Sequence, residues 1–109
     1  MIKVNGITWR IVYVSPLSDK LMREDGSYTI GMTDNYTKCI YLSNELEGKM
    51  LYKVLSHELV HCASFSYDCK IDTDTEEIIA DFISLYGKEI VENAQIIFEK
   101  LLNLVQMGA

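Results

Sequence analysis

The sequence has few of the residues that break or disorder a chain. It contains one proline and six glycines among 109 residues, and no segment is of low complexity. Hydrophobic residues make up 49% of the chain and charged residues 24%, the composition of an ordinary globular domain. A chain of this length builds one core, so we expect residues 1–109 to form a single domain.

Positive charge and long apolar runs are also scarce. Ten Lys and Arg residues stand against sixteen Asp and Glu residues, and the net charge is −6. The basic residues are scattered, so the chain lacks the basic patch that binds nucleic acids. No apolar run is long enough to span a membrane, and residues 1–6 do not resemble the start of a signal peptide. We therefore expect a soluble cytoplasmic protein without a nucleic-acid or membrane partner.

Cysteine is limited to Cys39, Cys62 and Cys69, an odd number without paired spacing. This count favours reduced thiols over a disulfide framework. Because free cysteine is often simply buried, we interpret all three as packing residues.

The first half of the chain predicts strands. Residues 7–14 are rich in β-branched and aromatic side chains and are followed by Ser15 and Pro16. Residues 28–33 and 38–42 predict two further strands, joined by a short loop with hairpin-like chemistry. We expect a small antiparallel sheet of about three strands.

The second half predicts helices. Apolar residues recur at helical spacing over about residues 45–65, and Asn44 and Glu47 have the spacing of a capping box at its start. This helix packs on the sheet, so the fold class is α+β.

One or two further helices follow. Thr73 and Glu76 predict a second capping box, and Gly87 is expected to end or kink the helix that it opens. Apolar residues between Ile90 and Val105 then predict a last amphipathic helix.

Both histidines of the chain lie in one motif, His57-Glu58-Leu59-Val60-His61. On a helix this spacing places two imidazoles one turn apart on the same side, within reach of one zinc ion. Glu58 lies on the apolar face of that helix, where a carboxylate without a partner is unfavourable. We interpret His57 and His61 as metal ligands and Glu58 as the general base, rather than as ordinary helix residues.

A catalytic zinc usually has three protein ligands and a water molecule. Since no third histidine exists, a carboxylate must complete the set, and the next helix supplies Glu76 and Glu77. The capping box already accounts for Glu76. We favour Glu77, because Asp81 lies one turn further on and can fix the tautomer of a ligand histidine by a hydrogen bond. The choice between Glu76 and Glu77 stays open at this point.

The motif His57-Glu58-x-x-His61, followed on the next helix by Glu77-x-x-x-Asp81, resembles the gluzincin signature of thermolysin-like peptidases. Residues 77–82 and the short spacing are similar to ImmA/IrrE-type metallopeptidases and to minimal single-domain gluzincins of bacteria and phages. The resemblance covers roughly residues 30–86. It implies a minimal zincin-like fold and a zinc metallopeptidase. The chain has Asp81 where that family often has Asn.

The expected reaction is peptide-bond hydrolysis by a zinc-activated water, with Glu58 accepting and returning the proton. Gluzincins usually add a Tyr or His donor to the developing oxyanion, and only Tyr67 and Tyr86 are candidates here, each more readily explained by packing. Zincins generally bind an extended peptide along a sheet edge, which we assign to residues 37–43. The resemblance makes a regulatory protein such as a repressor a reasonable substrate.

Two alternatives remain. The chain could be a non-catalytic zinc-binding or protein-interaction module, for which a closed site with a fourth ligand such as Cys69 is expected. It could also be an aminopeptidase rather than an endopeptidase, which requires an acidic group to hold the substrate N-terminus.

Overall fold

The first half of the chain forms a four-stranded mixed sheet. The computed structural model describes residues 1–106, and its strands are β1 (Ile2–Val4), β2 (Ile7–Val14), β3 (Gly31–Asp34) and β4 (Cys39–Ser43). Their order is β1-β2-β4-β3, with β4 parallel to β2 and antiparallel to β3. The α+β class is confirmed, whereas an antiparallel sheet of about three strands is wrong in strand number and in one pairing direction.

The additional strand is explained by the Asn5-Gly6 turn. Both residues have a positive φ, 50° at Asn5 and 75° at Gly6, as a type I′ hairpin turn requires. Asn-Gly is the pair that adopts this turn most readily, so β1 folds back onto β2 with Ile2 opposite Trp9.

Strand β4 lies at the centre of the sheet, and all five of its residues are buried. Apolar side chains pack on both faces of the sheet at β4, so neither face of this strand is exposed to water. On one side Ile40 and Leu42 pack against the helix α1 (Gly48–Ser66), and on the other Cys39 and Tyr41 pack against Leu21. Leu21 belongs to the 3₁₀ turn η1 (Asp19–Leu21).

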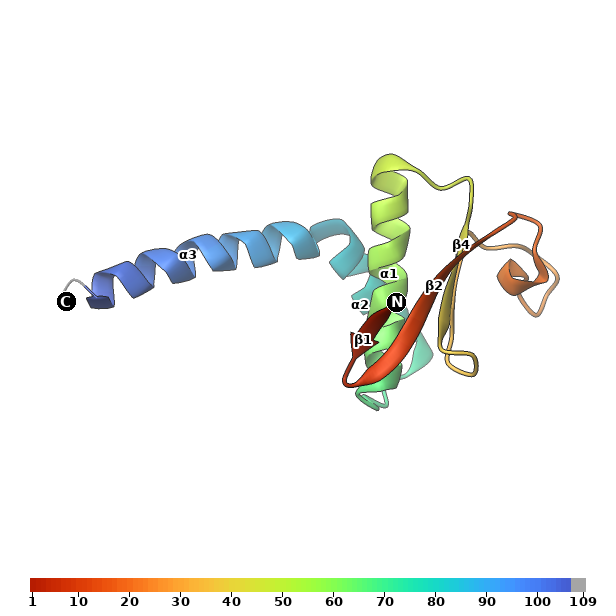
Figure 1. Ribbon diagram of the computed structural model, residues 1–109, viewed down its shortest axis with the longest axis horizontal. Helices are drawn as coiled ribbons and strands as arrows, with labels where there is room; N and C mark the ends of the chain where they lie inside the picture. The colour runs from red at the N-terminus through yellow and green to blue at the C-terminus, as the bar shows by residue number, and fades with distance from the viewer. Residues whose placement is uncertain (107–109) are drawn as a thin grey trace.

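Four helical segments form the second half: α1, α2 (Thr73–Phe82), the π-helical turn η2 (Ile83–Gly87) and α3 (Lys88–Gln106). The helix predicted over about residues 45–65 is confirmed as α1, which begins three residues later. The helix that begins at Thr73 ends at Phe82, before Gly87, which instead is the last residue of the π-helical turn. Helix α3 extends away from the rest of the domain (Figure 1). Within residues 1–106, no helix is long and apolar enough to cross a bilayer.

Both predicted capping boxes are wrong. The N-cap of α1 is Glu47, whose side chain makes no capping bond. Asn44 lies before this position, and its N–H is bonded to the carbonyl of Val14 at the end of β2. The N-cap of α2 is Asp72, whose carboxylate accepts from the backbone N–H of Thr75 at 3.0 Å. This shift by one residue frees Glu76 for a different contact.

Candidate metal centre

Helix α1 holds His57 and His61 one turn apart, with their ring centroids 4.9 Å apart in an edge-on arrangement. Two contacts fix the C-terminal half of α1 on the sheet. The Trp9 indole N–H donates to the hydroxyl of Ser66 at 2.8 Å, and Cys62 is fully buried in the core beside Trp9. Because the motif lies on a packed helix, the imidazoles have little freedom to move apart.

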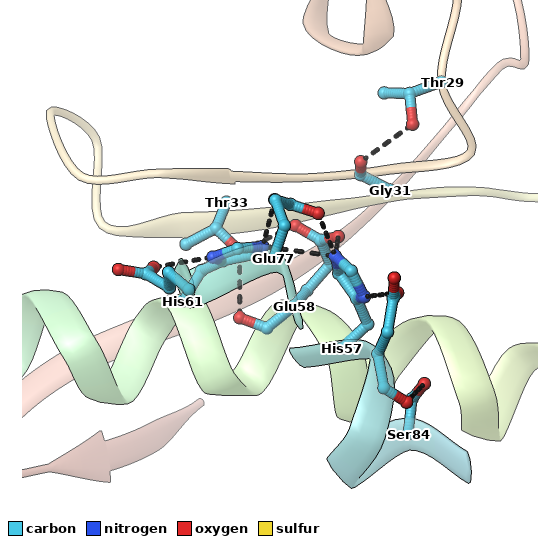
Figure 2. A network of polar contacts seen from close by, with 10 residues as sticks. Thr29, Gly31, Thr33, His57, Glu58, His61, Glu77 and Ser84 are labelled. Carbon is cyan, nitrogen blue, oxygen red and sulfur yellow. Dashed lines mark hydrogen bonds and ion pairs between the residues drawn. The ribbon is translucent and has the colours of Figure 1, made fainter. Parts of the chain in front are cut away.

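The Nε2 atoms of both histidines converge on the carboxylate of Glu77 (Figure 2). The two Nε2 atoms lie 3.2 Å apart. Glu77 Oε2 is 3.1 Å from Nε2 of His57, and Oε1 is 2.9 Å from Nε2 of His61. Ligands held at 2.0–2.1 Å by a tetrahedral ion lie about 3.3 Å from one another. These three side chains are therefore spaced so that they could hold a metal ion.

The Nδ1 atoms of the same rings face two further carboxylates. Nδ1 of His57 lies 3.0 Å from Oδ1 of Asp81, and Nδ1 of His61 lies 2.6 Å from Oε1 of Glu76. An Nδ1–H that donates to a carboxylate leaves the lone pair on Nε2, which is the form that binds a metal. Glu76 and Asp81 thus select the same tautomer at both histidines.

Glu76 is the residue whose predicted role changes most. It is not part of a capping box, since Asp72 caps α2. Its side chain is only 12% exposed, and its second oxygen accepts from the hydroxyl of Ser64 at 2.8 Å. The two consecutive acids of α2 therefore divide the tasks, with Glu77 facing the Nε2 atoms and Glu76 orienting His61.

Glu58 is buried beside this cluster but is not one of its donors. It is 7% exposed, and its Oε2 lies 4.0 Å from Nε2 of His57. The hydroxyl of Thr33 lies 2.9 Å from Oε1 of Glu58 and 3.0 Å from the backbone carbonyl of the same residue. Thr33 is thus the hydrogen-bond donor that fixes the carboxylate. A carboxylate in this position can accept a proton from a water molecule held between it and the donors.

The cluster lies at the floor of a cleft with a volume of about 770 Å³. One wall is β3 and the residues before it, and the other is α1. Gly31 permits this close approach, because a Cβ at its position would lie 2.6 Å from Cγ1 of Val54 and 3.2 Å from Cγ of Glu58. The absence of a side chain at Gly31 therefore sets the width of the cleft beside Glu58.

The sheet edge at this cleft is β3 and not the predicted segment 37–43. Strand β4 occupies most of that segment and is paired on both sides, with β2 and β3, so its backbone has no free edge. Strand β3 is the last strand of the sheet and lines the cleft. The error arises because β4 inserts between β2 and β3, which local sequence signals do not show.

Three other candidates lie outside the site. Tyr67 is exposed beyond the end of α1. Tyr86, which lies in η2, packs edge-on against Phe82 at the end of α2. Neither tyrosine lines the cleft. Cys69 is exposed and, among residues 1–106, does not join the donor group, while Cys39 and Cys62 are buried and unpaired. Neither predicted oxyanion donor nor a fourth cysteine ligand is therefore present at the centre.

Sequence reasoning missed Thr33, Ser64 and the orienting role of Glu76. Ser64 lies three residues after His61, so it shares a face of α1 with the motif, and this spacing was the available signal. Thr33 lies 25 residues before Glu58, and no local pattern connects the two.

Comparison of the chain with protein-family models, with curated proteins and with solved structures finds no match, so the evidence for its function is the geometry of this centre.

Proposed function

We propose that the chain is a zinc metallopeptidase of the gluzincin type, similar to ImmA/IrrE-type and minimal single-domain enzymes. One observation carries the proposal: three donor side chains converge, and a further carboxylate, that of Glu58, is buried next to them without joining them. Histidine nitrogens with one carboxylate are a donor set that zinc prefers in catalytic sites. A general base must lie beside the metal ligands without binding the metal, as Glu58 does here. A structural zinc site does not require such a carboxylate.

Each polar residue of the centre has a task in this proposal. Zinc, when bound, supplies Lewis acidity and lowers the pKa of a coordinated water molecule. Glu58 would accept a proton from the attacking water and return it to the leaving amine. Thr33 holds the carboxylate of Glu58 in place, while Glu76 and Asp81 keep both imidazoles in the tautomer that presents Nε2.

The substrate we propose is an extended peptide or protein segment added along β3. In the antiparallel ladder between β3 and β4, backbone groups face the partner strand and the free edge alternately. The N–H of Ser43 bonds the carbonyl of Ile30, so the backbone groups of Gly31 and Thr33 face the free edge. A peptide paired there passes beside Glu58.

The acids in the cleft favour an endopeptidase over an aminopeptidase. Those that line it within residues 1–106 are Glu58, Glu76 and Glu77, and all three contact or adjoin the histidines. An aminopeptidase requires a further acid for the substrate ammonium group. We therefore propose cleavage within a chain.

The second candidate is a non-catalytic zinc-binding or regulatory module. It is favoured only by the fact that three donors suffice to bind the metal. It leaves the open cleft and the buried Glu58 without a purpose, since structural zinc sites are closed by four protein ligands. We therefore rank it below the peptidase.

The test is a peptidase assay on the zinc-loaded chain with a quenched-fluorescence peptide library and an unfolded protein. Glu58→Gln should reduce kcat/KM by about 100- to 10,000-fold while zinc stays bound. Glu89→Gln, which removes an exposed carboxylate on α3, is the matched control and should leave the rate unchanged. A zinc-loaded wild type that cleaves nothing, or a Glu58→Gln variant as active as wild type, refutes the peptidase.

A further inference from the structure

Helix α3 exposes an unusual amount of apolar surface. Over its described length, Lys88–Gln106, no residue is buried, and it packs mainly against η2 while extending away from the sheet and α1 (Figure 1). Nine large apolar side chains on this helix are between 41% and 71% exposed: Ile90, Val91, Ile96, Ile97, Phe98, Leu101, Leu102, Leu104 and Val105. Together they expose on the order of 800 Å², more than the largest apolar patch of a typical monomer.

All of these except Ile96 form one continuous stripe. Within α3, Ile90, Ile97 and Leu104 recur every seven residues, with Ala94 and Leu101 between them. This alternating spacing of three and four residues is the pattern by which a helix packs along another helix. The opposite side of α3 carries polar residues: Lys88, Glu89, Glu92, Asn93, Gln95, Glu99, Lys100, Asn103 and Gln106.

Helices in proteins gain most of their stability by packing an apolar face, and α3 packs on the rest of the chain mainly through η2. The stripe is therefore free to pack against a partner. Charge argues against a lipid surface, because the polar side holds three glutamates and two lysines rather than the excess of basic residues that binds anionic membranes. The exposed area matches the roughly 800 Å² that each partner contributes to a stable protein interface.

We propose that α3 is a dimerisation helix, which pairs antiparallel with α3 of a second copy of this chain. Size complementarity sets the direction. Aligning the two helices antiparallel about their middle places Ala94 opposite Ile97 of the partner subunit and Ile90 opposite Leu101 of the partner subunit. The small Ala94 then receives a large side chain, as close packing requires. A parallel pair would place Ala94 against its own copy and leave a void.

In the antiparallel pair, each α3 ends beside the start of α3 of the partner subunit. The two metal centres then lie on separate bodies at opposite ends of the helix pair, so metal binding does not depend on the dimer.

Molar mass in solution tests the pairing, measured by sedimentation equilibrium on the full chain over a range of concentrations. The wild type should have twice the 12.5 kDa mass of one chain. Ile97→Glu should convert it to a monomer that still binds zinc, which shows that the body remains folded. Asn103→Glu adds the same charge on the polar side and should leave the dimer intact. A monomeric wild type, including one that binds anionic vesicles instead, overturns the proposal, as does an Ile97→Glu variant that remains dimeric.

Disulfide trapping tests the direction. In a Cys69→Ser background, which removes the exposed thiol, Ile90→Cys and Leu101→Cys are combined in one chain. These positions lie about 16 Å apart along one helix, so they cannot bridge within a chain. In the antiparallel pair Ile90 lies opposite Leu101 of the partner subunit, so only the double variant should form a covalent dimer. Covalent dimers of the single variants would indicate a parallel pair and overturn the assigned direction.

Discussion

The Nδ1 atom of His61 lies 2.6 Å from Oε1 of Glu76, and the other oxygen of that carboxylate accepts from Ser64. Ser64 and His61 both lie on α1, whereas Glu76 lies on α2. The carboxylate therefore joins the two helices that carry the proposed metal ligands. Through this contact, the packing of α2 on α1 sets the direction in which the His61 ring points.

Removing an orienting carboxylate should weaken metal binding without abolishing it. Glu76→Ala and Asp81→Ala should each reduce zinc affinity by about 10- to 100-fold, because the imidazoles lose the bonds that select their tautomer. Competition with a chromogenic chelator measures this. Asp74→Ala, an exposed acid in the first turn of the same helix, is the control and should bind zinc as wild type does. Equal affinity in all four proteins would show that Glu76 and Asp81 do not orient the ligands.

Loss of the Thr33 hydroxyl should affect turnover and not metal binding. Thr33→Val keeps the shape of the side chain but removes the donor to Glu58, so the base is less well positioned. We expect kcat to fall by roughly tenfold at unchanged zinc affinity, and Thr33→Ser to restore it. If zinc affinity and kcat fall together, the role of Thr33 is to shape the site as a whole.

A methyl group at position 31 should strain the contact between β3 and α1. Gly31→Ala places a Cβ 2.6 Å from Cγ1 of Val54, and overpacking of this kind lowers the free energy of unfolding by about 1–3 kcal/mol. Urea unfolding measures the loss. Val54→Ala removes the clashing atom, so the double variant should be more stable than the sum of the two single changes predicts. Additive effects would place the strain elsewhere.

Stability in acid should depend in part on the cap of α2. Hydrogen bonds from the hydroxyl and backbone N–H of Thr75 hold the pKa of Asp72 below its ordinary value of 3.8. A lowered pKa in the folded state stabilises the protein above pH 3.8, and this contribution is lost as the pH falls through the folded pKa. Asn caps a helix equally well but does not titrate.

The melting temperatures of wild type and Asp72→Asn, measured from about pH 7 down to pH 2, isolate this contribution. The difference in melting temperature between the two proteins should be constant near neutral pH. Below pH 3.8 the melting temperature of the wild type should fall relative to that of Asp72→Asn. A difference that stays constant over the whole range would show that Asp72 does not contribute through its charge.

The sequence predicted those features that depend on local spacing. The interval from His57 to His61 is a property of any helix, and the strand from Ile7 to Val14 follows from its own residues. The pairing between distant segments could not be predicted from local sequence patterns, because it depends on which strand inserts between which neighbours in the sheet. The position of β4 between β2 and β3, and with it the free edge of β3, is the main example.

The acids of α2 show the same limit at the level of single residues. Glu76 satisfies the capping-box pattern with Thr73, but Asp72 has the extended backbone of an N-cap and takes that position instead. If the N-cap is assigned one residue too late, every residue of the first turn is assigned to the wrong cap position. One position corresponds to about 100° around the helix axis. Pattern alone therefore favoured Glu77 over Glu76 as the ligand, but it did not reveal that Glu76 orients His61.

The most direct test of the account is the zinc content of the untagged protein, measured by elemental analysis beside Glu77→Ala and Glu58→Gln. We expect one zinc per chain in the wild type and in Glu58→Gln, because Glu58 is not a donor. Glu77→Ala should lose the metal, since the two imidazoles then lack their third partner. A wild type without zinc even after loading, or a Glu77→Ala variant that keeps a full equivalent, would contradict the central claim.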